Sequence, residues 1–130
     1  MSNRQRGEVE LALEGTQYVL KLDMAAMIEA EEKAGYGLMG MTIRIQEKRY
    51  GAREIAALIW AGFLGAKRAG MSQKCLGYDE ILEAMGRVGV MVFHSPAVQL
   101  LKLATRGLGI DGEDVALGKS EPEKQEATPT

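Results

Sequence analysis

A histidine followed by a serine is the most suggestive pair of residues for catalysis in this chain. His94 is the only histidine, and Ser95 comes directly after it. Nucleophilic catalysis needs a nucleophile, a base and a group that orients the base, and neighbours along one backbone rarely reach that arrangement. Because Pro96 follows, Ser95 and Pro96 better fit the N-cap and first position of a helix. We therefore expect no catalytic residue here.

Other chemically active residues are equally sparse. The only cysteine, Cys75, excludes an internal disulfide, and one cysteine with one histidine cannot form a Cys/His zinc site. Cys75 has no histidine near it in sequence, so a loop thiol without a role is expected. Asp111, Glu113 and Asp114 lack the spacing and the closing glutamate of a calcium loop. The sequence predicts a protein that is not an enzyme and that has no catalytic, metal or cofactor residues.

Three glycines have the spacing of a dinucleotide-binding loop. Gly35, Gly37 and Gly40 match the pattern, but that motif must follow a strand and open a βαβ unit. Here a predicted helix precedes the glycines and no parallel sheet follows. They are better explained as a helix end and a turn.

The elements that position these residues begin with a β-hairpin. Apolar and polar residues alternate on either side of a Gly15–Thr16 turn signal, which is the period of a half-buried strand. The apolar positions are Val9, Leu11 and Leu13, then Tyr18, Leu20 and Leu22. A lone hairpin is marginally stable in water, so it must pack on helices or on another subunit.

Helical periodicity replaces this alternation from Asp23, an N-cap candidate, to Leu108. Helices are expected over 24–34 with Gly35 as the stop, near 38–48, over 52–68, over 79–85 and from 96 to about 108. The residues expected to face inward are Met24, Met27, Ile28 and Ala34 in the first helix, Ile81, Leu82 and Met85 in the fourth, and Ala97, Leu100, Leu101, Ala104 and Leu108 in the last. Periodicity alone does not assign the apolar run Val88–Phe93, so the conformation of 86–95 stays open.

The fold class that follows is α+β, mostly α: an N-terminal β-hairpin packed on a bundle of four to five short helices. Residues 1–110 form a single globular domain, consistent with a length of 130 residues. Residues 111–130 carry six acidic residues and two lysines, and are expected to be a disordered acidic tail.

Charge is segregated along the chain. Residues 7–35 hold seven acidic and two basic residues, whereas 36–78 hold seven basic and two acidic ones. This pattern is that of a solvated surface or of a polar protein-docking surface. The charge is too small for a nucleic-acid footprint. The longest apolar stretch, Ile55–Gly65, is too short to cross a bilayer, and no signal peptide is evident, so a cytoplasmic protein is expected.

The 52–68 helix has a second apolar stripe, formed by Ala56, Trp60 and Leu64, which faces either the core or a partner. The candidate protein-binding residues combine this stripe with the hairpin and with a basic cluster of Lys48, Arg49 and Arg53 that could steer the encounter with a partner. The candidates are Tyr18, Leu20, Trp60, Leu64, Arg49 and Arg53.

The order of these patterns resembles the small tail protein of gene transfer agents and related siphophages, over about residues 4–109. The resemblance is carried by the N-terminal segment Arg4–Leu11, the turn with Tyr18, Leu20 and Leu22, the helix from Met24 to Gly35, and the segment Glu54–Gly62. Members of this family are often labelled tail tube proteins and are now interpreted as tail assembly chaperones. The resemblance implies binding to tail tube proteins, the tape measure protein, or both, and homo-oligomers are possible.

Three classes of function remain open. The first is a tail assembly chaperone of a gene transfer agent or prophage, absent from the finished particle and acting in the bacterial cytoplasm. The second is a structural tail tube component that stays in the particle. A tube subunit normally needs long strands that close a ring, and only two strands are evident, which favours the chaperone. The third is a small helical regulator.

Overall fold

The N-terminal hairpin forms as the alternation predicts. In the computed structural model, which describes residues 7–107, β1 (Glu8–Leu13) pairs antiparallel with β2 (Thr16–Lys21), with Val9 opposite Leu20 and Leu11 opposite Tyr18. Glu14 and Gly15 form the turn, both with positive φ (50° and 84°). That geometry matches the twist of the strands. The turn therefore lies one residue earlier than the predicted Gly15–Thr16.

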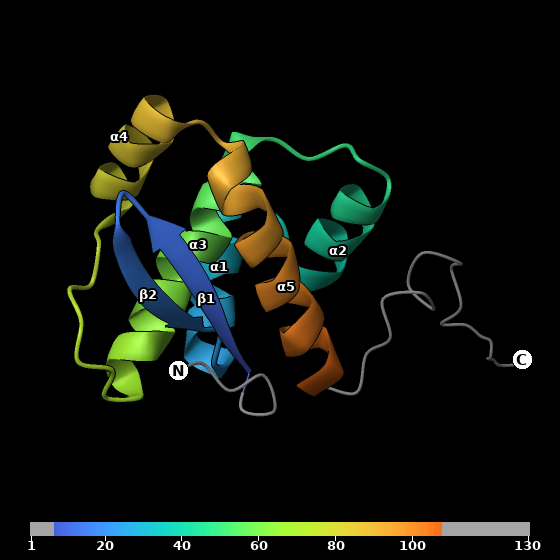
Figure 1. The fold of residues 1–130 in the computed structure, drawn as a ribbon. Helices are drawn as coiled ribbons and strands as arrows, with labels where there is room; N and C mark the ends of the chain where they lie inside the picture. The colour runs from blue at the N-terminus through green and yellow to red at the C-terminus, as the bar shows by residue number, and fades with distance from the viewer. Residues whose placement is uncertain (1–6, 108–130) are drawn as a thin grey trace, which may run out of the picture.

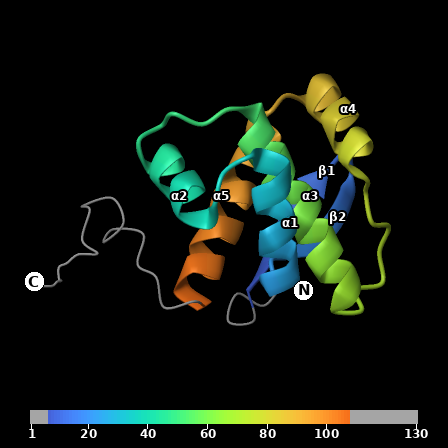
Figure 2. The ribbon, with the colours of Figure 1, turned by 180° about the vertical axis from the view of Figure 1, so that it is seen from behind.

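Five helices follow within the described residues: α1 (Met24–Ala34), α2 (Leu38–Gln46), α3 (Ala52–Arg68), α4 (Tyr78–Val88) and α5 (Met91–Gly107). Helix α3 lies at the centre and contacts α1, α4, α5 and β2 (Figure 1). The hairpin and α1 cover opposite sides of α3, as the reverse view shows (Figure 2). The predicted class, mostly α with an N-terminal hairpin, is confirmed. Leu108 and the predicted tail 111–130 lie outside the described residues.

Helix α1 packs through only part of its predicted face, since Met27 and Ala34 are buried as expected. Met24 and Ile28, expected inside, are 56% and 50% exposed, whereas Ala26, Ala30 and Ala34 are buried. These alanines recur every four residues and form one face. Their small side chains let α1 lie close against α3, and this outweighs burial of the larger Met24 and Ile28. Leu82 of α4 was also expected inside but is 42% exposed, because Ala84 takes the buried position beside Ile81 and Met85.

Helix α5 begins earlier than the sequence signals indicate. Ser95 and Pro96 were expected to start the helix, yet α5 starts at Met91 and contains Pro96. Phe93 in its first turn is fully buried and anchors it. A proline within a helix removes one backbone hydrogen bond, and near the N-terminus that loss is smaller than the gain from burying Phe93. The unassigned run Val88–Phe93 is thus the end of α4, a break at Gly89 (φ 93°) and the start of α5.

Two glycines allow β2 to lie directly on α3. A Cβ atom at Gly65 would stand 1.8 Å from the carbonyl oxygen of Lys21, and one at Gly62 would stand 3.0 Å from Leu20 Cβ in β2. The obstacle at Gly65 is backbone and cannot move aside, whereas the one at Gly62 belongs to a side chain. Gly65 therefore fixes the distance between the end of the hairpin and the central helix.

Replacing Gly65 with alanine should lower the unfolding free energy by about 3 kcal/mol or more, because the strand must separate from the helix. Gly86 in α4 is the matched control, since a Cβ there meets nothing within 4 Å. Gly86→Ala should stabilise by up to about 1 kcal/mol through helix propensity. Denaturant unfolding of both variants tests this, and equal stabilities would contradict the close packing.

Candidate protein-binding groove

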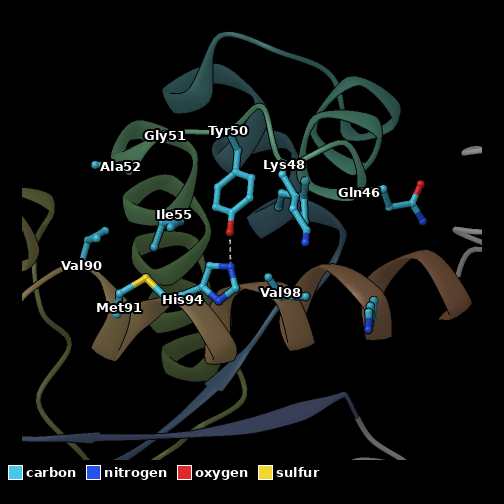
Figure 3. Close-up of a pocket in the computed structure, with 12 residues that line it drawn as sticks. Gln46, Lys48, Tyr50, Gly51, Ala52, Ile55, Val90, Met91, His94 and Val98 are labelled. Carbon is cyan, nitrogen blue, oxygen red and sulfur yellow. Dashed lines mark hydrogen bonds between the residues drawn. The ribbon is translucent and has the colours of Figure 1, made fainter.

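An open groove of about 530 Å³ lies between the α2–α3 region and α5. One wall comes from the end of α2, the connection 47–51 and the start of α3, and the other from the start and middle of α5 (Figure 3). Six of the twelve lining residues are aliphatic, and they supply a mainly apolar surface: Ile45, Ala52, Ile55, Val90, Met91 and Val98. The other six are Gln46, Lys48, Tyr50, Gly51, His94 and Lys102. We call this feature the α2–α5 groove.

A buried glutamate holds the first wall in place. Glu54, whose side chain is 4% exposed, accepts a hydrogen bond from the Gly51 N–H (2.9 Å) and one from Arg44 Nε (2.9 Å). The first bond caps α3, and the second ties α2 to it. Burial raises the pKa of Glu54, but the N–H groups and the Arg44 guanidinium outweigh burial and leave the pKa below its ordinary 4.5. Its charge therefore stabilises the fold at neutral pH.

The end of α2 is held in an uncommon conformation. Lys48 has φ 58°, in the left-handed region that glycine usually occupies after a helix. The Lys48 N–H donates to the Ile45 carbonyl, and the Arg49 N–H donates to the Arg44 carbonyl. Both bonds belong to the Schellman arrangement that ends a helix. A lysine there costs about 1 kcal/mol relative to glycine.

Tyr50 and His94 meet across the groove. The Tyr50 hydroxyl is hydrogen-bonded to His94 Nε2, and the rings stack with centroids 5.4 Å apart. Figure 3 places this pair in the middle of the groove, with Val90 and Met91 on one side and Lys48 and Val98 on the other. His94 thus joins two walls. Ser95 lies on the exposed side of α5, where its hydroxyl accepts a hydrogen bond from Gln99 (3.1 Å).

Of the two hairpin residues predicted to bind a partner, one is buried and the other is half-buried. Leu20 is fully buried, so it is unavailable to a partner in this conformation. Tyr18 is half-buried, and its ring packs edge-on against Phe63 with centroids 5.1 Å apart. The backbone groups in the middle of the outer edge of β2 are also hydrogen-bonded within the chain, by the side chain of Gln73. The Val19 N–H donates to Gln73 Oε1 (2.8 Å), and Gln73 Nε2 donates to the Val19 carbonyl (2.7 Å).

Trp60 and Leu64 are half-buried. Trp60 packs edge-on against Tyr78 at the start of α4, with centroids 6.0 Å apart, and the Lys33 ammonium lies 5.1 Å from its ring centre and 4.6 Å from that of Tyr78. The aromatic pair and the cation join α1, α3 and α4. Trp60 therefore has a packing role beside any role in binding.

Two of the three residues of the predicted basic cluster, Arg49 and Arg53, are already engaged within the chain, whereas Lys48 lines the groove. Arg49 pairs with Glu47 (3.1 Å), and Arg53 Nε donates to the Lys33 carbonyl (3.1 Å). Arg68 similarly binds Asp23 at the start of α1 (2.8 Å).

Trp60 and Leu64 are one helical turn apart and share a half-buried face of α3. Arg53 lies near this face, because it bonds Lys33, whose ammonium lies over the Trp60 ring. None of the six predicted residues lines the groove.

Sequence reasoning missed the α2–α5 groove. It joins residues 45–55 to residues 90–102, which are far apart in the chain. The usable signal was the apolar run Val88–Phe93, in which Met91 is 69% exposed in the structure. Within residues 7–107, no group of three potential metal ligands occurs, and no helix is long and apolar enough to cross a membrane.

Replacing Glu54 with glutamine should lower the unfolding free energy by about 1–3 kcal/mol at pH 7. Because the folded-state pKa of Glu54 is lowered, its stabilisation is present above the unfolded value and lost as pH falls through the folded one. The variant should therefore lose less stability than the wild type on acidification below about pH 4.5. Glu47→Gln, in an exposed pair, should change stability by less than about 1 kcal/mol. Thermal unfolding of the wild type and of Glu54→Gln from pH 3 to 7 tests this prediction. An equal loss of stability in the two proteins as the pH falls would refute the role of Glu54.

Replacing Trp60 with alanine should lower the unfolding free energy by about 2 kcal/mol, since the ring loses its contacts with Tyr78 and Lys33. Trp60→Phe should recover part of that loss. Met24→Ala, at an exposed position of α1, is the control and should be nearly neutral. Denaturant unfolding measures these stabilities. If the unfolding midpoint of Trp60→Ala equals that of the wild type, Trp60 has no packing role.

Comparison with known families identifies a match over all of the described residues. The family described as phage tail tube protein, GTA-gp10, matches residues 6–107, which include every helix and strand described above. No curated protein and no solved structure matches the chain significantly.

Proposed function

The chain belongs to the GTA-gp10 family of phage tail proteins, and from that premise we propose that it is a tail assembly chaperone. In this function it binds tail tube or tape measure proteins in the bacterial cytoplasm while the tail is built, and it leaves before the particle is complete. The role requires no catalysis. It requires a surface that holds apolar segments of other proteins.

The α2–α5 groove is the observation that carries this proposal. It is open, mostly apolar, and bounded by exposed side chains such as Met91. Apolar grooves between helices are a recurrent way of binding helical segments of partners. The groove thus supplies the kind of surface that a chaperone uses to shield a partner before polymerisation.

A structural tube subunit is the second candidate, because the matching family is described as a tail tube protein. Strand pairing between neighbours is the natural way to close a ring of subunits. Residues 7–107 contain a single two-stranded sheet, and Gln73 occupies part of the outer edge of β2. These features favour the chaperone over the tube subunit.

Purified particles distinguish the two functions. A chaperone should bind purified tail tube or tape measure protein in size-exclusion chromatography, yet be absent from finished particles by quantitative mass spectrometry. The tail tube and tape measure proteins, measured in the same particles, provide the internal control. Recovery of this chain in amounts comparable to the tube protein would instead establish the structural function.

A further inference from the structure

We propose that the α2–α5 groove binds an amphipathic helix of the partner tail protein, with an acidic residue at the end of that helix that lies between Lys48 and Lys102. This inference rests on the proposed function and specifies its partner segment. It follows from the uneven distribution of apolar and charged side chains along the groove.

One end of the groove is apolar. On one side of the Tyr50–His94 pair lie Val90, Met91 and Ala52 (Figure 3). Met91 is 69% exposed, and a methionine adapts its shape to varied apolar partners. Burial of this surface favours insertion of apolar side chains.

The other end is cationic. His94, Val98 and Lys102 are spaced four residues apart, so they share one face of α5, and Lys48 projects toward the same end from the opposite wall (Figure 3). No carboxylate lines the groove. Among residues 7–107, neither lysine has an ion-pair partner. Two lysines facing an apolar groove complement an acidic residue in the occupant.

The conformation of Lys48 supports a role for its side chain. Its φ of 58° is a conformation that glycine adopts more easily, so a lysine is not required at this position to end α2. The charge that this side chain supplies is directed toward the groove.

The dimensions of the groove favour a helix as the occupant. The lining stretch of α5 from Met91 to Lys102 is about 16 Å long at 1.5 Å per residue. A partner helix of about three turns matches that length. Its apolar residues would recur at intervals of three and four residues toward Met91, and its acidic residue would lie beside the two lysines.

Binding of the full chain to purified tail tube and tape measure proteins, and to 15-residue peptides that tile the bound protein, tests this inference. Lys48→Gly should leave stability unchanged or slightly higher, yet weaken binding about fivefold or more. Lys102→Glu should weaken it about tenfold, and Met91→Gln about fivefold. Exposed residues elsewhere provide matched controls: Lys67→Glu for charge and Met24→Gln for the apolar change, both at wild-type affinity.

The possible outcomes distinguish a failure of the inference about the groove from a failure of the proposed chaperone function. The inference is supported if the peptides that bind are amphipathic and acidic at one end, and if added salt weakens their binding. It is overturned if the full proteins bind all variants equally, or if the peptides that bind carry no acidic residue. If two copies of this chain instead bind each other through the groove, and the same variants abolish that self-association, the inference is also overturned. Failure of the wild-type chain to bind either tail protein would refute the proposed function itself.

Discussion

The close contact between Gly65 and the carbonyl of Lys21 is the constraint on which the rest of the structure depends. Because residue 65 has no Cβ, the end of β2 lies against α3, and Leu20 packs beside Gly62 between the hairpin and the central helix. Asp23 follows immediately. It caps α1 through the Ala26 N–H and binds Arg68 near the end of α3 through both carboxylate oxygens. The hairpin, α1 and α3 are therefore fixed together within a few residues of this contact.

Some of the segregated charges of the sequence pair with one another in the fold. The acidic N-terminal segment supplies Glu14 and Asp23, which bind Arg87 and Arg68, and Glu54 binds Arg44. Hydrogen bonding to Arg87 and to Arg68 holds the pKa values of Glu14 and Asp23 below their ordinary values. Complementary charge thus joins elements within the chain. At the α2–α5 groove, by contrast, Lys48 and Lys102 face apolar surface, which makes this end of the molecule suited to an external acidic group.

Local patterns predicted the elements well and their packing less well. The alternation before Leu22 and the bounds of α3 come directly from residue periodicity, and both are confirmed. The inward face of α1 was predicted correctly at Met27 and Ala34 but not elsewhere, because the close approach to α3 selects Ala26 and Ala30 over Met24 and Ile28. Burial of Phe93 likewise overrides the capping signal of Ser95 and Pro96. The groove was beyond reach because it depends on contact between distant segments, such as Tyr50 with His94.

Hydrogen–deuterium exchange of the chain, alone and in complex with its tail partner, tests most directly whether the groove is the working surface. Most backbone amides in the first turn of α5 lack intrahelical acceptors, and most of those in the connection 47–51 are hydrogen-bonded at a helix end, where local opening lets amides exchange in a free protein. Occupation of the groove predicts slower exchange in both segments, with no change around the exposed Met24 and Ile28 of α1. Protection at α1 or at the hairpin, with the two groove segments unchanged, would contradict the account.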